Sequence, residues 1–283
     1  MPSGRTASPA LETWRAALRA APAMLRIGVA ETVAYRAEFV VWMLTTTLPL
    51  IMLGLWTSVA SEAPFARFSE REFVAYYLGA LIVRNLTSSW VVWQLNEEIR
   101  RGMLSFRLLR PVHPFFTYAA SHISAVPLRS LVAIPFALVL LFSSAREILV
   151  TDPLLLVVLA FSLLGAWLVT FFVMVMIGSV GLFVDKSVAV FDVYFGIFAV
   201  MSGYLVPLAL LPGWAREIAA WLPFRFMLAF PVELAIGEYS KPGLGAAAAL
   251  RDLAIQWGWV VLIIGSAVAV WRAGIRRYEA FGS

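Results

Sequence analysis

Cysteine is absent from this sequence, and charged residues are scarce. Without cysteine, disulfide bonds and thiolate metal sites are excluded. Charged residues make up 14% of the 283 residues, whereas soluble domains carry about 25%. Hydrophobic residues make up 61%, and the mean hydropathy is +0.85. This balance predicts an integral membrane protein.

Motifs for catalysis and nucleotide binding are also missing. No Gly-Lys dipeptide occurs, so the chain has no P-loop, and neither G-x-S-x-G nor H-E-x-x-H is found. The two histidines, His113 and His122, have no carboxylate near them in sequence and make a poor metal pair. The sequence therefore predicts a non-catalytic chain without a cofactor or metal of its own. An intramembrane enzyme built from scattered residues is an alternative.

Six apolar segments are long enough to cross a bilayer as helices, which need about 20 mainly apolar residues. They predict an all-α protein with spans at 39–60, 73–93, 126–143, 154–184, 188–211 and 253–271. Before them, 11–29 mixes apolar residues with small ones and arginines, which predicts an interfacial helix; a frayed tail is the alternative. We therefore expect an N-terminal part, 1–35, and one six-span domain, 36–283.

Basic residues set the expected orientation. The net charge of +5 does not predict a nucleic-acid partner, because basic residues in membrane proteins mainly mark the cytoplasmic side. With a cytoplasmic N-terminus, the inside segments hold more basic residues than the outside ones. The inside set is Arg5, Arg15, Arg19, Arg26, Arg36, Arg100, Arg101, Arg107, Arg110, Lys186, Arg272, Arg276 and Arg277. Both termini and the loop between the second and third spans are therefore expected in the cytoplasm.

The segment 212–251 is rich in proline and glycine and differs from the spans around it. Two short helices are expected in its 212–237 part, at about 214–222 and 226–236, and the second is too short to span. We expect them to re-enter the outer leaflet, where non-helical backbone must be buried in protein or line a cavity. An ordinary extracellular loop is the alternative.

Arg84 and Asn85 lie near the middle of the second expected span. Charges inside a membrane are costly and usually face the bundle interior or a watery cavity. Arg84 is therefore a candidate for a substrate path or a gate, with a structural ion pair or a snorkelling side chain as an equal alternative. For Arg129, Asp192 and the 185–186 turn, snorkelling or a local pair is the preferred interpretation.

The cytoplasmic segment 95–111 (LNEEIRRGMLSFRLLRP) combines charge with apolar periodicity. As one helix over 95–110, it gathers an apolar stripe that we expect to face the membrane. The stripe consists of Leu95, Ile99, Met103, Phe106 and Leu109. Leu104 and Leu108 then form a second apolar spot on the outward face, and Gly102 is a candidate for a bend or an interruption of the helix. The pattern predicts a helix that docks into a soluble partner; a plain membrane anchor is the alternative.

Several short motifs follow one another along the chain. They are GMLSFRLLRP (102–111), SGYLVP (202–207), LPGW (211–214), LPF (222–224), Pro231 with Gly237, and WRAGIRRY (271–278). With them the chain resembles the permease subunit of a type-2 ABC transporter, of the ABC-2 family of transporter proteins. The resemblance covers nearly the whole chain; each motif is weak alone, and the ordered set is fairly specific.

The resemblance implies an assembly. Such permeases have six spans, an N-terminal elbow helix, a cytoplasmic coupling helix after the second span and two short extracellular helices before the sixth. They form homo- or heterodimers with a second permease and bind two copies of a separate ATPase, which carries the ATP and Mg²⁺. Most characterised relatives export drugs, lipids or polysaccharides.

Carried over to this chain, the resemblance implies particular contacts. The ATPase would bind Glu97, Glu98, Arg101, Leu104, Arg107 and Leu108, and the substrate path would pass Arg84, Asn85 and Tyr204. We therefore expect a multi-pass exporter subunit in contact with lipid in the bacterial cytoplasmic (inner) membrane. A stand-alone secondary transporter would need an internal repeat with paired broken helices. That transporter and an intramembrane scaffold are the alternatives.

Overall fold

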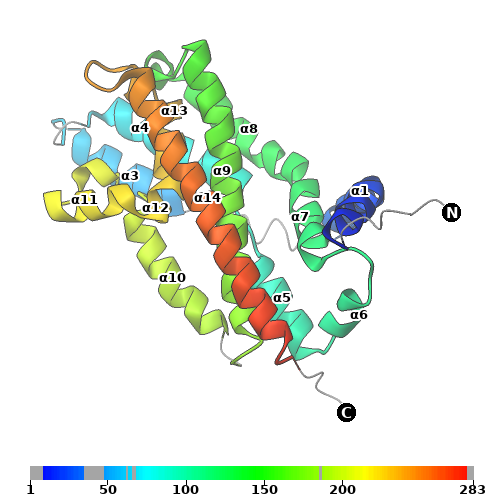
Figure 1. Ribbon diagram of the computed structural model, residues 1–283. Helices are drawn as coiled ribbons and strands as arrows, with labels where there is room; N and C mark the ends of the chain where they lie inside the picture. The colour runs from blue at the N-terminus through cyan, green and yellow to red at the C-terminus, as the bar shows by residue number, and fades with distance from the viewer. Residues whose placement is uncertain (1–8, 35–47, 62, 66–67, 185–186, 279–283) are drawn as a thin grey trace.

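The structure is a computed structural model that describes residues 9–34, 48–61, 63–65, 68–184 and 187–278. Within these ranges the protein is all-helical, apart from one isolated bridge between Phe65 and Phe68 (Figure 1). The long helices are α1 (Pro9–Ala34), α3 (Leu48–Ala60), α4 (Glu70–Thr87), α5 (Val91–Arg100), α7 (Pro114–Ser124), α8 (Val126–Phe142), α9 (Pro153–Val180), α10 (Ser187–Met201), α11 (Gly213–Trp221) and α14 (Gly245–Ile275). The short ones are α6 (Leu104–Leu108), η1 (Ser144–Ile148), η2 (Leu208–Leu210), α12 (Pro223–Met227), α13 (Ala229–Ala235) and η3 (Glu238–Ser240).

Three helical stretches in the described residues are long and apolar enough to cross a bilayer. They are Pro114–Phe142, which combines α7 and α8, Pro153–Val180 and Gly245–Ile275. Helices α3 and α10 are apolar but shorter, and residues 39–47 of the first expected span lie outside the described ranges. The all-α membrane fold is thus confirmed, and the number of six spans stays a prediction.

Helix α9 forms the centre of the molecule. It packs most extensively against α14, which runs beside it, and also contacts α4, α5, α10, α12 and α13 (Figure 1). Many of its side chains are buried, including the polar Ser162 and Thr170. A helix that is hydrophobic all round belongs in the interior of a bundle or in lipid, which agrees with this place.

Small residues allow the neighbours of α9 to approach its backbone. A Cβ atom on Gly165 would lie 2.8 Å from Cδ of Gln256 on α14, and one on Gly178 would lie 3.0 Å from Cδ2 of Leu95 on α5. The Gln256 amide, fully buried, donates to the carbonyl oxygens of Ser162 and Phe226, both at 2.9 Å. Close approach through small residues is the usual means of packing membrane helices.

The second expected span, 73–93, is not one helix. Helix α4 ends at Thr87, Ser88 is extended, and α5 begins at Val91. The freed backbone groups find side-chain partners on α7 and α8: the Trp90 N–H donates to Nε2 of His122 at 3.0 Å, and Arg129 donates to the Ser88 carbonyl at 2.7 Å. Such a break needs internal partners because a membrane interior offers no water.

The fifth expected span, 188–211, is also shorter as a helix. Helix α10 ends at Met201, and Gly203 follows with a left-handed φ of +84°. Two α4 side chains hold the irregular segment: the Tyr76 hydroxyl donates to the Gly203 carbonyl and the Tyr77 hydroxyl to the Leu205 carbonyl, both at 2.8 Å. Paired tyrosine donors thus take the place of helical hydrogen bonds.

The short helices between α10 and α14 agree in part with expectation. Helix α11 is present at the expected place, whereas the expected helix at 226–236 is split into α12 and α13. The split falls at Leu228, whose φ of −143° and ψ of −62° are not helical. Whether these helices enter a membrane stays a prediction, and so does the interfacial place of α1, which packs against α7.

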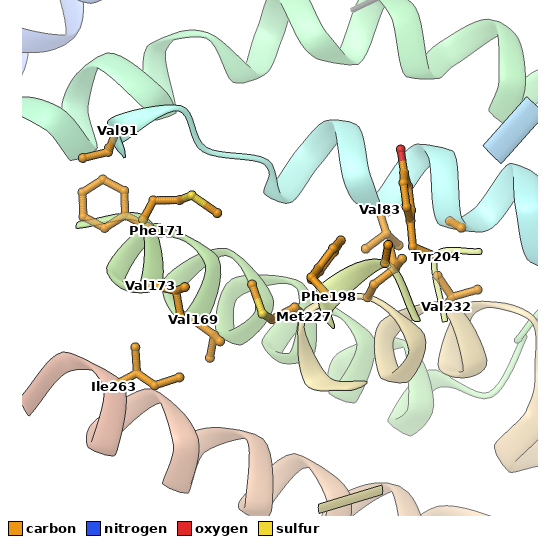
Figure 2. Close-up of a cluster of buried hydrophobic side chains, with 14 of the residues drawn as sticks. Val83, Val91, Val169, Phe171, Val173, Phe198, Tyr204, Met227, Val232 and Ile263 are labelled. Atoms are coloured by element: carbon orange, nitrogen blue, oxygen red, sulfur yellow. The ribbon is translucent and has the colours of Figure 1, made fainter. Parts of the chain in front are cut away.

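Apolar side chains from distant parts of the sequence form one core around α9. Figure 2 shows Val83 of α4, Phe171 of α9, Phe198 of α10 and Ile263 of α14 among its members. Tyr204, from the segment after α10, belongs to the same core and is labelled in the same view. The core therefore joins α10 and its irregular extension to α4.

Replacing Gly178 by Leu should destabilise this fold. The Cβ of the new side chain would press on Leu95 and would lie 3.3 Å from the Val92 backbone, so α5 must shift. Overpacking of this kind typically costs about 1–3 kcal/mol. Gly265→Leu on α14 is the matched control, because nothing lies within 4 Å of its Cβ position. Thermal unfolding in detergent should show a lower Tm for Gly178→Leu only; equal Tm values would contradict the close packing of α5 on α9.

Candidate functional site

The residues singled out by the sequence fall into two regions. The first is the α5–α6 turn, residues 95–110, near the end of the molecule where α10 begins and α14 finishes (Figure 1). The second surrounds Arg84, near the end of α4. The two regions belong to consecutive helices, and the break at 88–90 separates them.

The expected single helix over 95–110 is wrong. Helix α5 ends at Arg100, Gly102 adopts a left-handed φ of +70°, and α6 begins at Leu104. Glycine adopts this conformation without the steric cost that a Cβ brings, and it commonly ends helices. Gly102 is therefore a break and sends α6 off in a new direction.

Glu98 and Arg107 fasten α6 to the rest of the protein. Nε of Arg107 donates to Oε2 of Glu98 at 2.8 Å, and a second guanidinium nitrogen pairs with Oε1. The hydroxyl of Tyr118 on α7 donates to the same carboxylate at 2.6 Å, and Nη1 of Arg107 donates to Thr117 at 2.8 Å. The Arg107 guanidinium also lies 4.7 Å from the centre of the Tyr118 ring. We call these four residues the α5–α6–α7 clamp.

The break changes part of the expected faces of the turn. Leu104, expected on the outward face, is 0% exposed, and Leu108 is half-buried. Leu95 and Ile99, expected to face lipid, are buried against α9 and the core. The outward placement of Leu104 is wrong because the helix ends before it, so the 100° periodicity does not continue through Gly102.

The exposed surface of the turn is instead apolar with a basic border. Met103, Phe106 and Leu109 are exposed, the last two at 71% and 83%. They lie among exposed charged residues, namely Glu97, Arg100, Arg101 and Arg110. Glu97 and Arg101 form an exposed ion pair, which contributes little to stability but keeps both groups at the surface. We call this set of seven residues the docking surface.

The second region brings Arg84 and Tyr204 together. The Arg84 guanidinium lies 5.0 Å from the centre of the Phe198 ring and 5.6 Å from that of Tyr204. Tyr204 is buried, whereas Arg84 is partly exposed. Asn85 does not join them by a hydrogen bond: its amide donates to the Leu81 carbonyl, one turn back in the same helix, at 2.9 Å.

Arg129 belongs to the same neighbourhood, although the sequence favoured a snorkelling side chain or a local pair for it. It is 2% exposed, so the expectation that it snorkels toward water is wrong. Its guanidinium lies 4.3 Å from the centre of the Trp90 ring, and among the described residues it takes part in no ion pair. Its position is explained by its hydrogen bond to the Ser88 carbonyl at the α4–α5 break, 41 residues away. No local sequence signal predicts a contact of that range.

A third polar cluster lies at the opposite end of the molecule. Arg225 of α12 pairs with Glu233 of α13 at 2.9 Å and with Asp252 of α14 at 3.1 Å. Burial lowers the pKa of Arg225, but Glu233, Tyr239 and Asp252 outweigh it and raise that pKa above its ordinary value. A cavity of about 330 Å³ borders this cluster. The ion pairs tie the short helices to α14, and sequence reasoning did not identify them.

The histidines have separate structural roles. His113 caps α7, where its Nδ1 accepts from the Phe115 N–H at 3.3 Å, and burial lowers its pKa. His122 is fully buried and receives the Trp90 N–H described above. No group of three or more metal-binding side chains occurs among the residues with described positions.

Glu98→Ala should loosen the turn. Arg107 and Tyr118 would lose their shared partner, and hydrogen bonds to charged groups contribute about 1.5–3 kcal/mol. Hydrogen exchange of amides 101–110 should therefore accelerate by roughly ten- to a hundredfold, as those energies imply. Glu97→Ala, which removes only the exposed pair with Arg101, is the control and should leave the exchange nearly unchanged. Equal protection in both variants would show that the clamp does not hold α6.

Comparison with known proteins assigns the chain to a family. A family model described as ABC-2 family transporter protein matches residues 35–282, which is most of the chain. No curated protein matches it. The match agrees with the apolar helices of membrane length and with a multi-pass membrane protein. The chain belongs to the ABC-2 family of transporter proteins, whose members are membrane subunits of ABC transporters.

Proposed function

We propose that this chain is the non-catalytic permease subunit of an ATP-driven exporter in the bacterial inner membrane. The observation that carries the proposal is the docking surface: large apolar side chains stand exposed beside basic ones, on a turn that the clamp fixes to α7. An ABC-2 membrane subunit needs a separate ATPase, and this surface has the composition of an interface centre with a charged border.

The proposed ATPase contact differs in detail from the one expected from sequence. Phe106 and Leu109 provide its apolar centre, and Glu97 and Arg101 lie at its edge. Glu98 and Arg107 hold the turn in place, while Leu104 and Leu108 support it from within. Two copies of the ATPase, carrying ATP and Mg²⁺, would bind a dimer of this chain or its pair with a second six-span permease.

The proposed substrate is lipid-like, drug-like or a glycan, and its path passes Arg84 and Tyr204. The support is an arginine that is partly exposed and lies over buried aromatic rings. Asn85 stays a candidate on the same helix. Polar residues at such depth usually mark a path or a bundle interior.

Replacing Phe106 and Leu109 by Asp should release the ATPase. Each large apolar side chain buried at an interface contributes about 1.5–3 kcal/mol, so the double variant should bind the ATPase at least about tenfold more weakly. Co-purification and substrate-stimulated ATP hydrolysis measure the effect. Leu244→Asp, at an exposed position in the segment before α14, is the control and should behave like the parent protein. Normal coupling in the double variant would disprove the proposed contact.

The proposed orientation can be read with single cysteines, because the chain has none of its own. Arg276→Cys, at an exposed position just after α14, should react with a membrane-impermeant maleimide only after cells are permeabilised, because we propose that this end of the chain lies in the cytoplasm. Ser240→Cys, at an exposed position of η3, should react in intact cells. Labelling of position 276 in intact cells would reverse the orientation.

A further inference from the structure

Two arginines lie close together near the α4–α5 break. Arg84 comes from the last turn of α4, and Arg129 comes from α8, which packs along α4. Arg129 donates to the Ser88 carbonyl, and the Ser88 N–H donates to the Arg84 carbonyl, so Arg129 reaches the helix end that carries Arg84. Like charges held close in a medium of low dielectric constant repel strongly, so the arrangement calls for compensation.

Other arginines of this chain obtain that compensation from carboxylates. Arg107 pairs with Glu98, and Arg225 pairs with Glu233 and Asp252. Neither Arg84 nor Arg129 appears in any ion pair formed by the residues whose positions are described. The described part of the fold thus supplies carboxylates to some inner arginines and none to these two.

Hydrogen-bonding groups of both arginines also stay unused. The buried Nε of Arg84 and the buried Nη2 of Arg129 have no hydrogen-bond partner among the described residues. Nη1 of Arg129 donates to the Ser88 carbonyl, which fixes the guanidinium and leaves the buried Nη2 without a partner among the described residues. A buried charged donor without a partner lowers the stability of the folded protein. Ionisable residues inside membrane proteins therefore usually have a functional role.

Aromatic rings surround the two guanidinium groups. Arg84 lies over Phe198 and Tyr204, and Arg129 lies over Trp90. Ring faces attract a cation but leave its net charge in place. An anionic group that reaches the unpaired donors would therefore face two positive charges on an apolar, aromatic background.

We propose that Arg84 and Arg129 together bind the anionic headgroup, a phosphate or a carboxylate, of an amphiphilic substrate. The planar guanidinium suits both groups because it can donate two parallel hydrogen bonds to them. Arg84, which is partly exposed, meets the headgroup first, and the buried Arg129 completes the charge balance. The inference rests on the proposed transport function and narrows its substrate to anionic amphiphiles.

The test uses the full chain with the partner subunits that co-purify with it, in a neutral detergent. Three probes are compared: dioleoylphosphatidylglycerol, dioleoylphosphatidylcholine and inorganic phosphate. Binding is followed by native mass spectrometry and by the shift in Tm. Phosphatidylglycerol should bind at least about tenfold more tightly than phosphatidylcholine, because both carry a phosphate but the choline cation of phosphatidylcholine would be repelled by the two arginines.

Variants connect the binding to the two arginines. Arg84→Gln and Arg129→Gln should each lower the affinity for phosphatidylglycerol about tenfold or more. Arg84→Lys and Arg129→Lys should recover part of it, because they keep the charge and lose only the planar fork. Arg216→Gln, at an exposed position of α11, is the control. Should Arg129→Gln fail to fold, Arg84→Gln alone decides, because its side chain is partly exposed.

The outcomes separate the sources of the anion and the two proposals. A rise in Tm with phosphatidylglycerol alone supports a lipid-like substrate. A rise in Tm with inorganic phosphate as well supports the site and shows that a free anion can enter it. Equal binding of phosphatidylcholine, or unchanged affinity in both Gln variants, overturns the site. If the ATPase still co-purifies in that case, the proposed permease function is unaffected. If no ATPase co-purifies with the parent protein, the permease function itself is contradicted.

Discussion

The structure depends on one constraint: a polar group inside an apolar protein must find its partner within the protein. Each interruption of a long helix exposes backbone N–H and C=O groups, and an unpaired one in a membrane interior costs several kcal/mol. At the breaks at 88–90 and after Met201, side chains form hydrogen bonds with the freed backbone groups. His122 and Arg129 serve the first, and Tyr76 and Tyr77 serve the second.

The same constraint divides the arginines of the interior into two groups. Arg107 and Arg225 each meet carboxylates, and each pair joins short helices to a long one. Arg84 and Arg129 meet aromatic rings and a carbonyl oxygen. The first group joins helices through ion pairs. The second group places positive charge between α4 and α8, where no carboxylate of the described residues pairs with it. Carboxylate partners therefore distinguish the arginines that join helices from the two for which we propose a ligand.

The clamp gives the α5–α6 turn the rigidity that a mechanical contact requires. A flexible loop would not transmit a force from a bound partner. Helix α6 is instead held to α5 through Glu98 and to α7 through Tyr118 and Thr117. Helix α5 in turn packs on α9 through Gly178, and α7 continues into the apolar α8. A displacement of the turn would thus reach both α9 and the α7–α8 helix, on either side of the break near Arg84.

The sequence by itself determined the class of the molecule. Long apolar segments dictate membrane helices because a bilayer favours about 20 apolar residues in a row, and three such helices are present in the described ranges. The ordered motifs indicated the family that the match over 35–282 shows. Helix α11 and the apolar helices α9 and α14 were predictable for the same reason, since local composition decides whether a segment is helical and apolar.

Only the tertiary structure decided how these helices end and what their polar residues do. The helical pattern could not show that Gly102 stops α5, because glycine is compatible with both a bend and a break; the faces of Leu104, Phe106 and Leu109 followed from that choice. Arg129 and Tyr118 acquired their roles from partners 41 and 20 residues away. Contacts of that range depend on how α7 and α8 pack beside α4 and α5, and a periodicity within one helix carries no information about its neighbours.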